Sequence, residues 1–273
     1  MLKHHVVVGV DGSVVSTRAL DAAAEEAVRR SVPLEIVYAV PDLDVAGPVL
    51  TSSADRVAAR HPELPVRLTA LAGNPAAGLV ARGGNAALVV VGTRALGALA
   101  SLASRSVAQL VAERSRCPLL VVGTSCLTSH AEAHEVLFAV GSDADLEAAS
   151  FAFEEAVRRS ARLRFVYTAH YRSFTAVAPY STAPETGIKC EAGAEERPGG
   201  FGPLPDRELV TATASADVVV IARRQHGAGG SRHMRTVHAL LHHARCPVLL
   251  APVGPSAPPD GIGHVSTGGS SVS

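Results

Sequence analysis

Residues Val89 to Val122 read VVVGTRALGALASLASRSVAQLVAERSRCPLLVV, and this stretch decides the fold. An apolar run at its start predicts a buried parallel strand, and Val107, Leu110 and Val111 have the spacing of one helix face. A loop rich in Gly, Ala and Ser lies between them, and a second apolar run follows. The unpaired N–H groups and the positive dipole end of such a helix attract anions. The stretch therefore predicts a strand, loop, helix and strand whose backbone amides face an anion.

The chain contains an internal repeat. The segment Ala22–Val40, AAAEEAVRRSVPLEIVYAV, recurs about 129 residues later as FAFEEAVRRSARLRFVYTA. The end of the opening stretch, RCPLLVV, recurs as RCPVLLA at Arg245–Ala251. Strands alternate with helices in both copies, which predicts two tandem α/β domains, each with a doubly wound parallel sheet.

Five strands are expected in the first copy and fewer in the second, so the second domain is reduced. We expect one domain at residues 1–125 and another at 133–252, followed by a disordered tail at 253–273. Residues 171–204 are rich in Pro, Gly and polar side chains, which predicts a loop or disordered insert with Ile188–Cys190 as a vestigial strand at most. The expected strands are Val6–Val10, Leu34–Val40, Val66–Ala70, Leu88–Val91, Leu119–Val122, Val136–Val140, Leu163–Thr168, Val218–Ile221 and Val248–Leu250.

The opening stretch resembles the signature of the universal stress protein family. That signature is a glycine, two residues, a second glycine, nine residues, a third glycine and Ser or Thr. The corresponding positions here are Gly92, Ala95, Arg105 and Ser106, and VVVGVDGS at Val6–Ser13 resembles the family's first strand and its aspartate. The resemblance implies a Rossmann-like fold with strand order 3-2-1-4-5 and a ligand crevice between the first and fourth strands.

The resemblance also implies an adenine-nucleotide site in the first domain, for ATP with Mg. Asp11 and Ala39 would contact the nucleoside, while Gly92, Arg105, Ser106 and Val107 would lie beside the phosphates. Asp11 has a second interpretation, a turn or helix-cap residue in the DGS sequence.

Two departures from the signature bear on this site. Ala95 and Arg105 replace glycines, and neither accepts a left-handed backbone as easily as glycine does. Arg105 could fill the space of a phosphate, pair with a phosphate, or face solvent. The second copy keeps no signature glycine, and Val140 stands at the place of Asp11 unless one residue is shifted. Its loop offers a basic anion nest or a surface loop, and we expect this copy to be mainly a structural partner.

Composition narrows the remaining classes. Lys plus Arg and Asp plus Glu both number 25, and Trp is absent, which argues against binding to nucleic acid or to an anionic membrane. No apolar stretch has membrane-spanning length and no signal-peptide core is visible, so a cytoplasmic location is expected. Cys117 and Cys246 precede apolar runs, which predicts small buried thiols. His238 and His242 share a helix face but lack the carboxylate of a zinc motif, so no metal is expected.

The sequence therefore favours a non-enzymatic regulatory or binding module of the stress response. Two alternatives stay open, a protein-interaction scaffold without nucleotide and a slow ATP hydrolase. Against catalysis, Asp11 is the lone acidic candidate for a general base. We expect the two domains to pair within the chain as a pseudo-dimer through Leu119–Val122 and Val248–Leu250, with a homodimer as a further alternative.

Overall fold

The strands form one continuous sheet in the order β3-β2-β1-β4-β5-β10-β9-β6-β7-β8. The computed structural model describes residues 5–93, 106–126, 134–168, 190–191, 206–223 and 231–253. The first half contributes the order 3-2-1-4-5, as expected, and the second half contributes the same order in reverse. The strands are β1 (Val6–Val10), β2 (Leu34–Val40), β3 (Val66–Ala72), β4 (Leu88–Thr93), β5 (Leu119–Gly123), β6 (Glu135–Val140), β7 (Arg162–Tyr167), β8 (Cys190–Glu191), β9 (Val218–Arg223) and β10 (Val248–Pro252).

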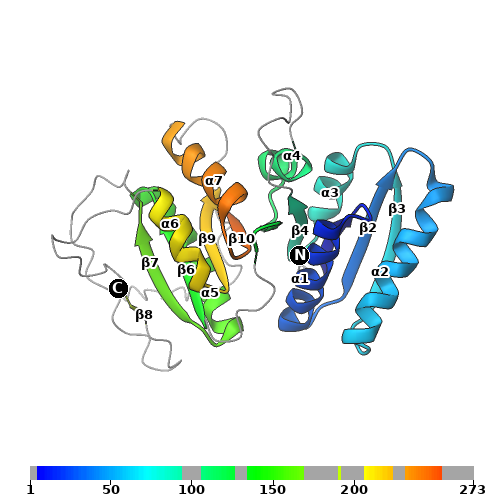
Figure 1. Ribbon diagram of the computed structural model, residues 1–273, viewed down its shortest axis with the longest axis horizontal. Coiled ribbons are helices and arrows are strands. Elements are labelled where there is room, and N and C mark those ends of the chain that lie inside the picture. The colour runs from blue at the N-terminus through cyan, green and yellow to red at the C-terminus, as the bar shows by residue number, and fades with distance from the viewer. Residues whose placement is uncertain are drawn as a thin grey trace, which may run out of the picture.

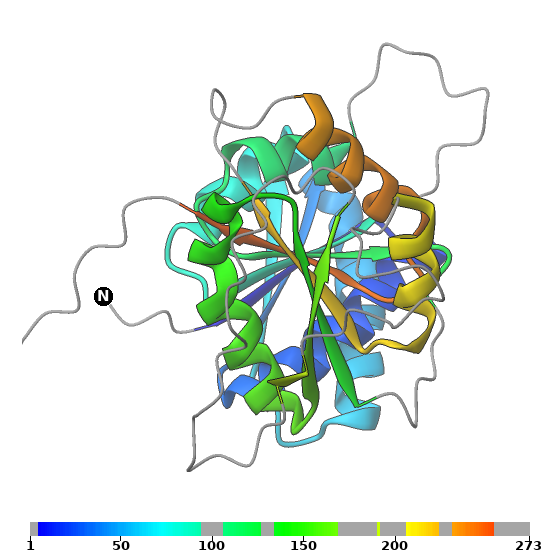
Figure 2. The same cartoon turned by 90° about the vertical axis from the view of Figure 1, so that its left-hand side faces the viewer.

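Helices cover both faces of this sheet. One buried cluster joins alternate strand residues to α1, α2 and α5, and the other joins the remaining strand residues to α3, α4, α6 and α7. Figure 1 shows the halves side by side, and Figure 2 shows the strands fanning through a large angle, as right-handed strand twist requires. The helices are α1 (Val14–Arg30), α2 (Ala46–Arg60), α3 (Pro75–Gly83), α4 (Val107–Arg114), α5 (Ala149–Arg159), α6 (Asp206–Ala212) and α7 (Ser231–His243), with 3₁₀ turns η1 (Leu43–Val45), η2 (Asp143–Ala148) and η3 (Thr213–Ser215).

The two halves meet along β5 and β10, which pair antiparallel. Leu120 lies opposite Leu249, its counterpart in the repeat, so the register is two-fold symmetric about this pair. All other strand pairs in the described sheet are parallel. The pairing expected from the sequence is confirmed, and it satisfies backbone groups that would otherwise be exposed at two edges.

The repeat extends to the way the helices end. Both α1 and α5 stop at a serine in the left-handed region, Ser31 at φ 52° and Ser160 at φ 51°. Each cap amide donates to two carbonyls of the last turn, which closes the helix. The two helices begin differently, because Ser13 caps α1 whereas η2 precedes α5.

The second half is reduced at its outer edge. Its outermost strand, β8, has two residues, Cys190 and Glu191, and overlaps the vestigial strand expected there. Most of the insert at 171–204 and of the tail at 253–273 lies outside the described residues. No helix in the described ranges is long and apolar enough to cross a membrane.

Candidate functional site

The carboxyl ends of β2, β1 and β4 lie next to one another in the first half. Val8 of β1 pairs with Val90 of β4, so Asp11, just after β1, and Gly92 end neighbouring strands. Ala39 lies near the end of β2, on the other side of β1. The helix α4 returns from this edge toward the start of β5. This is the switch point at which open α/β sheets bind ligands, because the loops diverge there.

Asp11 shapes the turn between β1 and α1. Its Oδ1 accepts the amide of Ser13 at 2.9 Å, and its own amide donates to Ser16 Oγ at 3.3 Å. Ser13 is the residue that caps α1, through its Oγ and the Ser16 amide at 3.2 Å. Asp11 therefore does form the turn that was one of its two interpretations. The Asp11 side chain is also exposed at the edge, where a ligand could reach it.

Gly92 is required for packing rather than for unusual backbone geometry. It is a strand residue and is not among the residues with positive φ. A Cβ at this position would lie 2.9 Å from the Val15 carbonyl oxygen and 2.9 Å from its Cγ1. The glycine lets β4 approach the first turn of α1 closely.

The amino end of α4 is a well-formed cap. Ser106 Oγ accepts the Gln109 amide at 3.2 Å, and Gln109 Oε1 accepts the Ser106 amide at 3.0 Å. This capping box occupies two of the first amides. The amides of Val107 and Ala108 have no acceptor within the helix, because they belong to its first turn. Ser106 and Val107 thus lie at the amino end of α4, the end of a helix that attracts phosphate. Arg105, Ala95 and Arg94 lie outside the described residues.

The second copy lacks any counterpart of Asp11. Leu34 pairs with Val6, and its repeat equivalent Leu163 pairs with Val136, so the end of β1 at Val10 corresponds to Val140. The helix repeat, however, aligns Gly12-Ser13 with Gly141-Ser142. The strand register therefore supports the one-residue shift, and it places Gly141 rather than an aspartate directly after the strand end.

Two cysteines are buried, and histidines of α7 lie close to one another. Cys117 and Cys246 are 3% and 0% exposed, which confirms the expected packing, and burial raises the pKa of Cys246. The rings of His238 and His242 lie 4.2 Å apart, and burial lowers the pKa of His242. Within the described ranges, no three His, Cys, Asp or Glu side chains group as a metal site would require.

The repeated EEAVRR motif builds an ion-pair ring between the halves that sequence reasoning missed. Arg30 of α1 binds Glu155 of α5, and Arg159 of α5 binds Glu26 of α1. Each arginine also binds the glutamate of its own helix. We call these four side chains the interdomain ring. All four are buried, with exposures of 2–9%, and burial lowers the pKa of Arg30 to about 10.

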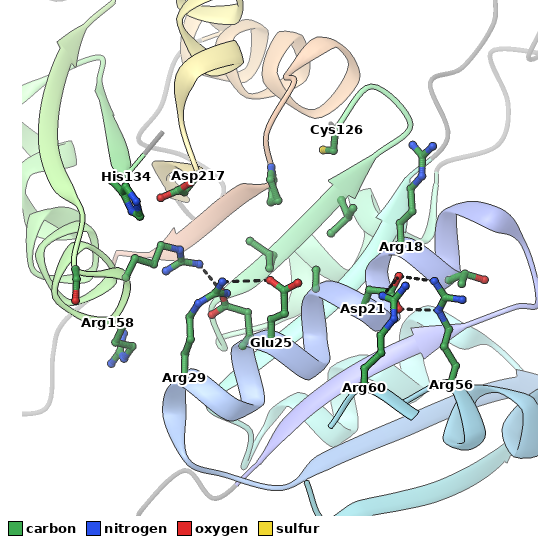
Figure 3. A pocket seen from close by; sticks show the side chains of 18 of the residues that line it. Arg18, Asp21, Glu25, Arg29, Arg56, Arg60, Cys126, His134, Arg158 and Asp217 are labelled. Atoms are coloured by element: carbon green, nitrogen blue, oxygen red, sulfur yellow. Dashed lines mark hydrogen bonds and ion pairs between the residues drawn. The ribbon is translucent and has the colours of Figure 1, made fainter. Parts of the chain in front are cut away.

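A cleft of ≈ 850 Å³ lies beside this ring, between α1 and the second half (Figure 3). Its walls are charged and largely paired. Asp21 binds Arg56 at 2.7 Å and Arg60 at 3.0 Å, and Glu25 binds Arg29 at 3.1 Å. Arg18 donates to the Thr124 carbonyl at 2.7 Å. None of the predicted site residues that the structure describes lines this cleft, so it is distinct from the carboxyl edge of the first half.

Comparisons with known proteins agree with this architecture. The model of the universal stress protein family matches residues 3–123 and again 132–252. Universal stress protein Rv2005c of Mycobacterium tuberculosis is 30% identical over 91% of this chain and 97% of its own length. A universal stress protein from Archaeoglobus fulgidus matches 93% of this chain and 98% of its own, with TM-score 0.66 and 14% identity. A universal stress protein solved in complex with cAMP is 32% identical, covering 45% of this chain and 99% of its own, with TM-score 0.41. The chain belongs to the universal stress protein family, as a member with two tandem domains.

Proposed function

We propose that the first half binds an adenine nucleotide such as ATP and that the chain acts as a regulatory binding module. The observation that carries this proposal is the amino end of α4 beside the end of β4. The first-turn amides of Val107 and Ala108, the helix dipole and the Ser106 hydroxyl together favour a phosphate there. The exposed Asp11 and the half-buried Ala39 supply the nucleoside side of the same edge.

Asp11 would act through its charge as well as through its turn. A carboxylate accepts hydrogen bonds from ribose hydroxyls, and Asn in its place keeps the turn but loses the charge. Within the described ranges, no cluster of carboxylates and histidines stands ready to hold Mg²⁺. A magnesium ion would therefore arrive with the phosphates, and no step of the proposal depends on it.

Equilibrium dialysis of the full chain against ATP, ADP and AMP tests the proposal. We expect saturable binding that weakens about tenfold in Asp11→Ala, with a smaller loss in Asp11→Asn, since a charge-assisted hydrogen bond contributes about 1.5–3 kcal/mol. Arg162→Ala, at an exposed position in β7, is the control and should bind as the unmodified chain does. Absence of binding at millimolar nucleotide would instead favour the interaction scaffold.

The hydrolase alternative has its own test. A hydrolase needs a base placed against the attacking water, and the Asp11 carboxylate already accepts the Ser13 amide. Prolonged incubation with ATP and Mg²⁺ should give the same small amount of ADP with the unmodified chain and with Asp11→Ala. Faster ADP formation by the unmodified chain would support the enzyme instead.

A further inference from the structure

The crevice of the second half is filled by its own side chains. Asp145 occupies the repeat position of Ser16, and its carboxylate is fully buried. Its Oδ2 accepts the amides of Gly141 at 2.8 Å and Ser142 at 2.9 Å. In the first half the smaller Ser16 Oγ accepts a single amide from this turn, that of Asp11, at 3.3 Å. The turn of the second half is therefore held by two hydrogen bonds to a buried carboxylate, where the first half has one to a hydroxyl.

Two more side chains crowd the same point. A Cβ at Gly141 would lie 3.2 Å from Asp145 Oδ2, 3.4 Å from Thr168 Oγ1 and 4.0 Å from His233 Nδ1. Thr168 is the counterpart of Ala39, and it is 2% exposed. The other ring nitrogen of His233 lies 2.9 Å from the carbonyl of Ala222, the counterpart of Gly92. Polar groups of Asp145, Thr168 and His233 thus surround Gly141 at the strand end of the second half.

The phosphate side also differs from that of the first half. The helix α7 starts at Ser231, so Arg235 and Thr236, the counterparts of Ser106 and Val107, lie inside it rather than at its first turn. Amides at such positions donate to carbonyls four residues earlier and are lost to a ligand. Thr236 Oγ1 also donates to Asp206 at 2.8 Å. A phosphate entering here would further meet the negative charge of Asp145.

We propose that Asp145, Thr168 and His233 close the second crevice, so that each chain binds one adenine nucleotide, in its first half. The stoichiometry rests on the nucleotide binding proposed above, whereas the closure rests on the geometry of the second half alone. The Asp145 carboxylate is the central group, because it holds two amides of the turn and excludes an anion.

Nucleotide stoichiometry is measured by equilibrium dialysis of the full chain with ATP, combined with hydrogen exchange read by mass spectrometry. We expect one ATP per chain, with slower exchange in peptides spanning 11–16 and 106–110 and no change at 136–146. Two ATP per chain, or ATP-dependent protection at 136–146, would overturn the closure while leaving nucleotide binding intact. Absence of any binding would overturn the stoichiometry together with the proposed function.

The closure has a test that needs no nucleotide. Asp145→Ser copies the first-half residue and can accept one amide instead of two, so amide exchange at Ser142 should become about tenfold faster by NMR. Glu147→Ser removes an exposed carboxylate from the same 3₁₀ turn and is the matched control, with no change expected. Unchanged exchange at both Gly141 and Ser142 in Asp145→Ser would overturn the role of this carboxylate.

Discussion

At the scale of single residues, the same position in the two halves carries different side chains for identifiable steric reasons. A Cβ added at Gly92 would lie 2.9 Å from the Val15 carbonyl oxygen, which is closer than a normal contact. The counterpart of Gly92 in the second half is Ala222, which is fully buried. There the 3₁₀ turn η2 stands where α1 begins in the first half, so the close approach of α1 to β4 is the steric reason for a glycine in the first half.

Gly92→Ala should destabilise the chain by about 1–3 kcal/mol, because the obstructing atoms include backbone that cannot rotate away. Gly47→Ala is the opposing control. Gly47 lies in α2 with no atom within 4 Å of an added Cβ, so alanine should stabilise by about 0.5–1 kcal/mol. Urea unfolding followed by circular dichroism measures both. Equal effects of the two substitutions would contradict the packing role of Gly92.

Much of the first-half site could be predicted from residues, and part of the second half could not. The apolar run before DGS places the end of β1 correctly at Val10, and the run before Gly92 places the end of β4 two residues early, because strand patterns are local. The position of the missing residue was ambiguous in sequence, since VLFAVGSD aligns with VVVGVDGS in two ways. The sheet register resolved it. Nothing local marks His233 as a neighbour of Ala222, because that contact depends on where α7 starts.

At the scale of elements, α1 and α5 carry the interdomain ring, in which each glutamate meets one ring arginine from each half. Each glutamate has a third arginine partner outside the ring, Arg29 or Arg158. Removing one member of a buried ion pair leaves an unpaired charge. Glu155→Gln should therefore cost about 3–5 kcal/mol. Replacing all four members with Leu or Met should be neutral or stabilising by about 1–4 kcal/mol, because desolvation is relieved. Thermal unfolding compares the two variants, and a severe loss in the fourfold variant would contradict this account.

The ring also predicts a dependence on pH. Desolvation would raise the pKa of Glu155, but the charges of Arg159 and Arg30 outweigh it and hold the pKa below its usual value. A depressed carboxyl pKa contributes stability above the unfolded value of about 4.3, and this contribution disappears as pH falls through the folded value. The free energy of unfolding should be level from about pH 7 to 5 and fall below about pH 4. Glu155→Gln should flatten that acid limb.

The EEAVRR motif is visible twice in the sequence, but its role in joining the two halves could not be predicted from the sequence. Each pair four residues apart also fits an ordinary exposed helix face. Its role depends on the antiparallel β5–β10 seam, which brings the two copies together and buries them. The seam was predictable from two unpaired edges, but the contacts above it required the relative position of the helices.

At the scale of the whole molecule, the β5–β10 pairing is symmetric about Leu120 and Leu249. The first half therefore contacts the second half much as it would contact a second copy of itself. A chain ending at residue 126 should therefore form dimers through β5, with Leu120 opposite Leu120 and Arg30 beside Glu26 of the other copy. Size-exclusion chromatography with light scattering would detect them. Arg30→Glu should weaken this dimer, since it places like charges together, and a truncated chain that stays monomeric at high concentration would contradict the prediction.

The full chain should behave differently, because both copies of the seam are covalently joined. Its midpoint of thermal unfolding should not change with protein concentration, whereas that of the truncated dimer should rise with concentration. Calorimetry over a hundredfold range of concentration distinguishes the two cases. A concentration-dependent midpoint for the full chain would indicate pairing between chains.

The symmetric register about Leu120 and Leu249 has a consequence for how the duplicated gene could change. In a dimer of identical subunits, every substitution appears on both sides at once, so a pocket cannot be abandoned on one side alone. Fusion removes that restriction. In a single chain, one half can change its pocket alone, while the paired strands of the two halves keep matching contacts at their shared boundary.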